Sequence, residues 1–345
     1  MGSNHRPVTI KSIAQELGIS FSTVSKALNG NPAIKEETRE MVVEKARELG
    51  YTPNSLAKGL RGDSTKTIAV IFNDIENPAL TFIFRSIAID MANYGYTTMI
   101  FDSQFSEATE RANILTVLSR QPDFIILEPN STNTENLKLL EGMERRLILQ
   151  GARYESVDCH YIHVDYFRGG YLSAYELLSK GHRDCLVFTQ PLSFPISRLY
   201  GLGIKKAFEE YHIPFDDERI FITPSTIADG FKRMQELWDT RQKRYRIPFT
   251  GIMTFDDNLA YGVYKSAKQN GLSIPEDVSV IGFDDTPITQ FSAPPLTTIH
   301  LPKEKMAESY IQILNSTLID QHTDIRTFTL EPYLVSRDSV KNLLI

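Results

Sequence analysis

The sequence predicts an α/β protein in which a small all-α segment precedes two lobes built on parallel sheets. Three short amphipathic helical periods fill the first fifty residues. From residue 66 onward, short apolar runs alternate with helical periods, which is typical of parallel strands covered by helices on both faces. These runs are too many for one small sheet, so we expect two doubly wound lobes.

The segment from Thr9 to Asn29, TIKSIAQELGISFSTVSKALN, predicts two short helices around a tight turn. Thr9 and Ser20 are good N-caps, and Gly18 can adopt the left-handed backbone that a sharp turn needs. We expect the second helix to bury its apolar residues and to leave outside Phe21, Ser22, Ser25, Lys26 and Asn29. Such side chains suit contact with base edges and phosphates, although the spacing alone also fits an ordinary helical hairpin.

A third helix is predicted over residues 36–49, where Gly50 is a C-terminal stop. Its expected buried stripe is Met41, Val42, Ala46 and Leu49. Beyond Pro53, a further helix is predicted to begin at Asn54 and to run to Arg61. It is too short to be stable alone in water, so we expect it to form only when something holds it.

Charge divides the chain unevenly. Residues 1–62 hold nine basic and six acidic residues, which is a net charge of +3. The whole chain has a net charge of −6, so the remaining residues carry −9. We therefore expect nucleic acid to contact the N-terminal segment and to be repelled by the rest. The two cysteines, Cys159 and Cys185, give no disulfide framework and no metal-ligand spacing, which fits a reducing cytoplasm. No apolar run approaches the length of a membrane span, so we expect no membrane partner.

Eight apolar runs between residues 67 and 283 are the predicted strands. They are 67–72, 97–101, 123–127, 146–150, 161–165, 185–189, 251–255 and 278–283. In open α/β sheets a ligand lies beyond the carboxyl ends of the strands, so the space between two lobes is the expected binding site.

These motifs resemble the lactose-repressor (LacI/GalR) family of bacterial transcription regulators over essentially the whole chain. The resemblance rests on VTIKSIAQELGISFSTVSKALNGNP, EETRE and ELGYTPNSLAKGLR within residues 8–61, and on PEDVSVIGFDD, PPLTTI and LVSRDS farther along. It implies an N-terminal helix-turn-helix headpiece and a two-lobed sensor with the periplasmic-binding-protein-like fold. One departure is Lys35, which stands where the family usually has a serine that caps the third helix.

The resemblance implies four segments. Residues 1–51 are the headpiece, and residues 52–65 are a hinge helix and linker. Residues 66–163 and 300–322 form the N-terminal sensor lobe, and residues 164–299 and 323–345 form the C-terminal sensor lobe. The chain thus crosses between the lobes three times.

The family resemblance also assigns DNA-binding positions. The base-reading positions are Phe21, Ser22 and Lys26. The phosphate-contacting positions are Thr9, Ser20, Thr23, Ser25 and Asn29. Leu60 matches the leucine that wedges into the minor groove, with Ala57 beside it, and the two hinge helices of a homodimer must pair to insert it.

Four effector-binding positions follow from the same resemblance: Gln150, Arg198, Asp256 and Asp284. Arg198 is expected to be a cation that faces Asp284, a pattern that favours a sugar. Asp256 stands where most relatives have asparagine, and the alternative that it only caps the following helix stays open. Leu80 and Ser225 also depart from aromatic positions of the family.

We therefore expect an effector-responsive regulator, a repressor, that binds a pseudo-palindromic double-stranded operator as a homodimer and senses a sugar or sugar derivative. We expect no cofactor, no metal and no catalysis, because the Gly-Leu-Gly at 201–203 lies in a helical pattern and lacks a dinucleotide fingerprint. The alternatives are a solute-binding protein or an enzyme that uses the same α/β fold without DNA control.

Overall fold

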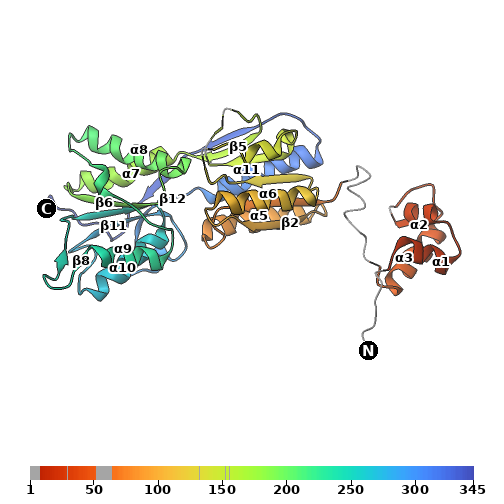
Figure 1. Ribbon diagram of the computed structural model, residues 1–345, viewed down its shortest axis with the longest axis horizontal. Coiled ribbons are helices and arrows are strands. Elements are labelled where there is room, and N and C mark those ends of the chain that lie inside the picture. The colour runs from red at the N-terminus through yellow and green to blue at the C-terminus, as the bar shows by residue number, and fades with distance from the viewer. Residues whose placement is uncertain (1–7, 29, 52–63, 132, 152, 155) are drawn as a thin grey trace. The chain divides into compact units, whose positions relative to one another are not determined.

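The protein is described by a computed structural model that covers residues 8–28, 30–51, 64–131, 133–151, 153–154 and 156–345. The chain divides into two compact units, Met1–Thr65 and Lys66–Ile345, each with its own core (Figure 1). In these ranges, no helix is both long and apolar enough to cross a membrane.

The first unit contains the three predicted helices. They are α1 (Ile10–Leu17), α2 (Phe21–Leu28) and α3 (Glu36–Glu48). Their shared core consists of Ile13, Ala14, Val24, Ala27, Val42 and Ala46. Met41 was expected in this core but is exposed, because α3 turns Val42 and Ala46, one helical turn apart, toward its neighbours. Lys35 precedes α3 and makes no side-chain cap hydrogen bond, as its departure from the family pattern predicts.

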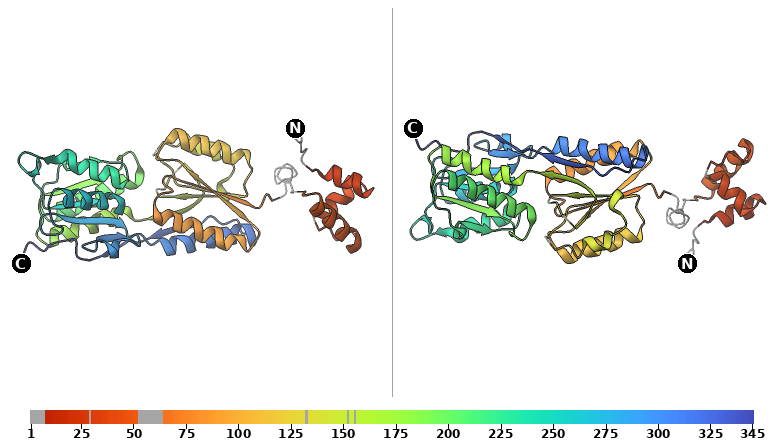
Figure 2. Two further views of the ribbon diagram at one scale, coloured as in Figure 1. Left: turned by 90° about the horizontal axis from the view of Figure 1, so that it is seen from below. Right: turned by 90° about the horizontal axis from the view of Figure 1, so that it is seen from above.

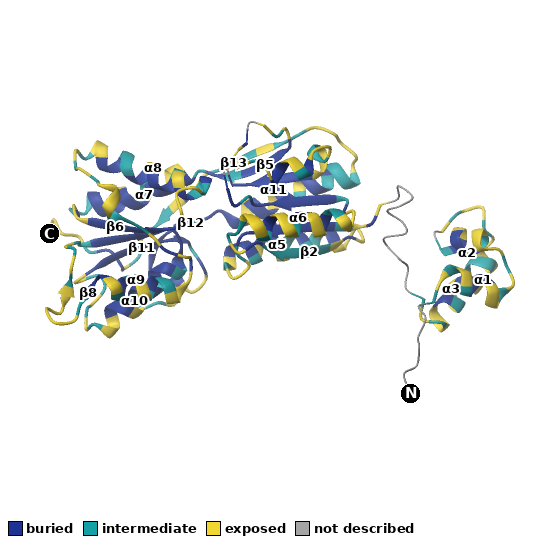
Figure 3. Cartoon of the chain, in the orientation of Figure 1, coloured by how far each residue is buried: buried dark blue, intermediate teal, exposed yellow. Residues whose placement is uncertain are grey.

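The first lobe of the second unit is a six-stranded parallel sheet in the order β13-β5-β4-β3-β1-β2. The strands are β1 (Thr67–Phe72), β2 (Thr97–Asp102), β3 (Phe124–Leu127), β4 (Leu147–Gln150), β5 (His160–Val164) and β13 (Thr327–Leu330). Helices α5 (Pro78–Ala92) and α11 (Lys303–Leu314) cover one face, and α6 (Glu107–Ser119) covers the other (Figure 2). Buried residues concentrate on the strands, as Figure 3 shows.

The second lobe has the sheet order β14-β12-β11-β10-β6-β7. The strands are β6 (Cys185–Thr189), β7 (Ile220–Ile222), β10 (Gly251–Thr254), β11 (Ser279–Asp284), β12 (Thr297–His300) and β14 (Tyr333–Val335). Helices α7 (Tyr166–Ser179) and α8 (Pro195–Glu210) lie on one face, and α9 (Ile227–Leu237) and α10 (Asp257–Gln269) lie on the other. Only β14 runs antiparallel to its neighbour in this sheet. A small hairpin, β8 (Trp238–Asp239) and β9 (Arg244–Tyr245), extends from α9.

The chain crosses between the two sheets three times, after β5, after β12 and after β13. The first two crossings lie near the expected positions. The third was expected at residue 322, but β13 at Thr327–Leu330 still pairs with β5 of the first lobe. The crossing therefore lies between β13 and β14. After helix α11, which covers the first sheet, the chain adds β13 to the edge of that same sheet before it leaves the lobe.

Candidate nucleic-acid interface and interlobe cleft

The turn between α1 and α2 is held by side-chain caps. Thr9 begins α1: its backbone N–H donates to Ser12 Oγ at 3.0 Å, and Ser12 N–H donates to Thr9 Oγ1 at 3.3 Å. Gly18 ends α1 with a φ of 65°, the left-handed backbone that glycine adopts readily. Ser20 caps α2 by accepting the Thr23 N–H at 3.0 Å. These contacts fix the geometry of a helix-turn-helix.

The outer face of α2 carries most of the side chains expected to meet DNA. Phe21, Ser22 and Lys26 are exposed, and Thr23 is half-buried. Ser25 is an exception, since it was expected outside but is only 8% exposed. On the helix surface it lies beside the half-buried Leu28, at the edge of the stripe that contains the buried Val24, so the small serine side chain is covered. Three expected positions, Asn29, Ala57 and Leu60, lie outside the described residues.

The cleft between the two lobes gathers side chains that follow strands. Its lining residues are Asn73, Asp74, Asn77, Leu80, Phe105, Glu128, Tyr166, Gln190, Ile196, Ser225, Phe255, Asp256, Asn258, Phe283, Asp284 and Leu301. Most of the polar ones lie at the last residue of β1, β3, β6, β10 or β11 or within two residues beyond it, as expected for the carboxyl ends of parallel strands. The departures Leu80 and Ser225 both lie in this lining, so they bear directly on what the cleft can bind.

The lobes are closed on each other. Asn77 Nδ2 of the first lobe donates to Asp284 Oδ2 of the second at 3.0 Å. The rings of Phe105 and Phe194, one from each lobe, stack with centroids 5.8 Å apart. The space left between the lobes is about 40 Å³, which is room for only a few water molecules. A larger ligand therefore requires the lobes to open.

Asp256 has two roles to fill. Its Oδ1 accepts the backbone N–H of Leu259 at 2.8 Å, so it caps α10. Its Oδ2 is buried and makes no hydrogen bond to any described residue. Burial raises the pKa of Asp256 to about 6. Interactions with the Ser225 side chain and with the Leu259 N–H offset part of this rise. Of the two interpretations left open by the sequence, the structure shows the cap and leaves one oxygen for a ligand.

Asp284 occupies a strained position at the end of β11. Its φ of 104° is rare for any residue but glycine, and such strain concentrates at functional sites. Burial raises the pKa of Asp284 well above its usual range, and Asp257 and Asp256 add to that rise. The next residue, Asp285, is instead paired with Arg337 at 2.7 Å and His300 at 2.9 Å.

Arg198 is not among the residues that line the cleft, so the structure does not bring it opposite Asp284 as expected. It is exposed on α8 and borders a separate hollow with Leu192 and Lys205. Ile196, two residues earlier, is the side chain of α8 that lines the cleft. Two residues correspond to about 200° around a helix, which directs Arg198 to the opposite side.

Gln150 lies behind the cleft rather than in its lining. It is buried, and its Oε1 accepts a hydrogen bond from the Tyr310 hydroxyl. Glu128 lines the cleft and interacts with Gln150. Burial raises the pKa of Glu128 to about 7, and interactions with Gln150 and Asn73 offset part of this rise. Four further lining residues were not predicted from the sequence: Glu128, Asp74, Asn77 and Gln190. The available signal was their place at or just beyond the ends of apolar strands.

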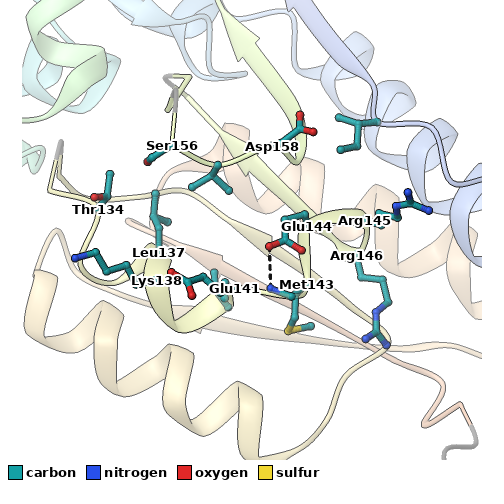
Figure 4. Close-up of a pocket in the computed structure, with 14 residues that line it drawn as sticks. Thr134, Leu137, Lys138, Glu141, Met143, Glu144, Arg145, Arg146, Ser156 and Asp158 are labelled. Carbon is teal, nitrogen blue, oxygen red and sulfur yellow. Dashed lines mark hydrogen bonds between the residues drawn. The ribbon is translucent and has the colours of Figure 1, made fainter.

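A larger hollow, of about 850 Å³, lies on the first lobe (Figure 4). It is bordered by residues 137–146 and 156–158, and the Gly142 N–H donates to Glu144 Oε1 there at 2.8 Å. None of its described lining residues has a buried polar atom that lacks a hydrogen bond. We therefore regard the interlobe cleft as the better candidate for a ligand site.

Two family models match the chain. Residues 9–54 match the model described as bacterial regulatory proteins, lacI family, and residues 174–340 match the periplasmic binding protein-like domain. The HTH-type transcriptional repressor CytR of Escherichia coli (strain K12) is 29% identical over 339 residues, which are 97% of this chain and 97% of that protein.

Solved structures show the same fold. A LacI family transcriptional regulator from Enterococcus faecium with bound ribose has a TM-score of 0.70 and 25% identity, covering 80% of this chain and 99% of that one. The lac repressor dimer bound to operator and the anti-inducer ONPF has a TM-score of 0.77 and 21% identity, covering 97% of this chain and 100% of that one.

Proposed function

The chain belongs to the lacI family of bacterial regulatory proteins, and from that premise we propose that it is an effector-responsive transcriptional repressor. Its headpiece binds a pseudo-palindromic operator, and a small metabolite in the interlobe cleft controls that binding. The observation that carries the proposal is the combination, in one chain, of a capped helix-turn-helix with an exposed second helix and a cleft with unsatisfied buried acceptors. Such a protein acts where the chromosome is, in the cytoplasm.

Within the headpiece, we assign base reading to Phe21, Ser22 and Lys26 of α2. Their exposure and chemistry support this role, because Lys and Ser donate to base edges and phosphates while Phe offers an apolar contact. Thr9, Ser20 and Thr23 support phosphate contacts from the start of each helix, where N–H groups and helix dipoles favour anions. Asn29, Ala57 and Leu60 keep their predicted roles, the last two at the centre of the operator.

We propose that the operator-binding form is a homodimer. Two exposed apolar patches on the second unit support this proposal. Phe82 and Ile89 share one face of α5, and Ile288 and Phe291 lie in the segment after β11, where they are 58% and 78% exposed. Apolar side chains this exposed in one region are typical of an interface. The paired headpieces then read two half-sites.

The effector is proposed to be a sugar or sugar derivative. The acid and amide side chains of the cleft accept and donate hydrogen bonds of the kind hydroxyl groups make, and Tyr166, Phe255 and Phe283 offer apolar ring faces. The two lobes would enclose the ligand between them. We keep Gln150, Asp256 and Asp284 in roles at or behind this site, and we assign no role there to Arg198, which does not line the cleft.

The proposal is tested by selecting duplexes from a random DNA library with the full chain and measuring the affinity of the enriched sequence by electrophoretic mobility shift. We expect a pseudo-palindrome bound by two chains. A double variant, Ser22→Ala with Lys26→Ala, should lose the preference for that sequence, whereas Asp216→Asn, an exposed change in the second unit, should keep it. Enrichment of no common sequence by the unaltered chain would contradict the proposal.

A further inference from the structure

The lining of the interlobe cleft has an unusual charge composition. Four of its side chains are carboxylic acids: Asp74, Glu128, Asp256 and Asp284. No lysine, arginine or histidine is among the described residues that line the cleft. A phosphate or carboxylate ligand would meet only like charge here, because a buried anion needs a cation or several donors beside it.

The buried polar atoms of the lining that lack partners are all acceptors. Oε2 of Glu128, Oδ2 of Asp256 and Oε1 of Gln190 make no hydrogen bond within the described part of the chain. Glu128 is 4% exposed, and the other two are each 5% exposed. Gln190 has already committed its Nε2 to Ser225 Oγ at 2.5 Å. A ligand that completes this site must therefore bring donors.

The nearby cations are committed elsewhere. Lys303 Nζ donates to the backbone oxygen of Asp285 at 3.2 Å, and its attraction lowers the pKa of Asp284 only as a minor influence beside burial. Arg337 and His300 both bind the Asp285 carboxylate. Arg198 lies on the outer side of α8. The four carboxyls thus have no basic side chain of their own to neutralise them among the residues described.

Closing the lobes brings like charges together. Glu128 and Asp74 belong to the first lobe, and Asp256 and Asp284 belong to the second. Asp74 raises the pKa of both Glu128 and Asp256, which is repulsion within and across the cleft, although burial is the larger cause in each case. Repulsion of this kind opposes closure of the empty cleft, and a cation placed between the lobes would remove it.

We propose that the effector carries a protonated amine, which binds between Glu128 of the first lobe and Asp256 and Asp284 of the second. An ammonium group offers three donors and no acceptor, which matches the unsatisfied oxygens. The rings of Tyr166, Phe255 and Phe283 beside them also suit a cation, because an aromatic face attracts positive charge. This inference rests on the proposed function and narrows it from sugars in general to amine-bearing ligands such as amino sugars.

The test uses matched triples of small ligands in a thermal-shift screen on the full chain, followed by isothermal titration calorimetry. The triples are glucosamine, glucose and glucose 6-phosphate; galactosamine, galactose and galactose 6-phosphate; and putrescine, 1,4-butanediol and succinate. In at least one triple, we expect the amine to raise the melting temperature and to bind at least about tenfold more tightly than its neutral partner. The anionic members should not bind.

Two isosteric variants localise the effect. Glu128→Gln and Asp256→Asn should each weaken the amine by at least about tenfold, because each removes a charge but little volume. Asparagine at 256 can still cap α10, and fluorescence of Trp238, the single tryptophan, reports that the second unit stays folded. The matched controls Glu218→Gln and Asp216→Asn change exposed acids outside the cleft and should leave the affinity unaltered.

A neutral or anionic member that binds as tightly as the amine of its triple would overturn the inference. So would a screen in which no amine raises the melting temperature, or unchanged amine affinity in both cleft variants. Selection of operator DNA by the same preparations separates the two proposals. A chain that selects a pseudo-palindrome but prefers neutral sugars keeps the proposed function and loses only the amine. A chain that binds the amine but selects no DNA keeps the amine inference and loses the proposed function.

Discussion

The headpiece and the cleft of the sensor use polar side chains in opposite ways. In the headpiece, the hydroxyl groups of Thr9 and Ser20 accept hydrogen bonds that cap α1 and α2. The residues expected to read DNA lie exposed on the capped helix α2. In the cleft, Glu128 and Asp256 are buried, and each has one carboxylate oxygen that makes no hydrogen bond to a described residue.

This difference reflects the two partners. DNA is a large surface that a rigid helix can meet without enclosing it. A small metabolite must be surrounded to be bound, so its site carries unsatisfied groups at the expense of stability until the ligand arrives. The headpiece should therefore be sensitive to its core, and the sensor should be sensitive to charge.

The largest expected effect is in the headpiece core. Ile13→Ala removes a fully buried side chain from a core of six buried residues and should destabilise that unit by about 2–5 kcal/mol. A small unit has little stability to lose, so operator binding should disappear. Urea unfolding followed by Trp238 fluorescence should show an unchanged second unit. A parallel loss of stability there would contradict the independence of the two units.

The next effect is in the cleft and depends on pH. Because the pKa of Asp256 is raised to about 6 from 3.8, its ionisation destabilises the folded sensor, and the stability present below pH 4 is lost as the pH rises through 6. Asp256→Asn should therefore raise the unfolding free energy at pH 8 by about 3 kcal/mol, an advantage that shrinks as the pH falls toward 4. The measurement is urea unfolding at a series of pH values. Asp216→Asn is the control, and a variant no more stable than the parent at pH 8 would show that the buried charge is not a burden.

A third effect concerns the exposed patch of the second lobe. Phe291→Asp should weaken the dimer by about 2 kcal/mol or more, since a large apolar anchor is replaced by a charge. Sedimentation velocity measures the dimer, and operator affinity should fall with it. Leu202→Asp, an equally drastic change on the exposed side of α8, should leave the dimer intact. A Phe291→Asp protein that remains dimeric would place the interface elsewhere.

The smallest effects separate base reading from positioning within the headpiece. Lys26→Ala should cost about 1–3 kcal/mol on the preferred operator and change which sequence is preferred. Thr9→Ala should weaken all sequences alike by about 1 kcal/mol, because it removes a cap and a phosphate contact. Competition binding to a set of operator variants measures both. Identical sequence profiles for Lys26→Ala and Thr9→Ala would contradict the assigned roles.

Much of this fold could be predicted from the sequence. Strands such as β1 and β6 are uninterrupted apolar runs, and the caps at Thr9, Gly18 and Ser20 are local features that need no knowledge of the rest of the chain. By contrast, β13 and β14 are short edge strands, and burial alternates along β13. The sheet that β13 joins depends on its pairing with β5, more than a hundred residues earlier in the chain, so the third crossing was misplaced.

The site was harder to predict for a related reason. Asp256 and Asp284 follow strands and do line the cleft, as expected. The position of Arg198 could not be predicted from the sequence, because it depends on the rotation of α8 about its axis. Close packing against α7 sets that rotation: a Cβ at Gly203 would lie 1.9 Å from the Phe167 carbonyl oxygen. Ser25 failed because the edge of a buried stripe is decided by neighbouring helices. Glu128 was overlooked because one acid after a strand is a weak signal alone.

The central claim is that occupancy of the cleft controls the headpiece, and operator affinity measured with and without the best ligand of the screen tests it most directly. Coupling of the usual size predicts a change of at least about fivefold, and Asp256→Asn should need at least about tenfold more of an amine ligand than the parent to reach its own full response. An operator affinity that is the same with the cleft empty and saturated would contradict the account.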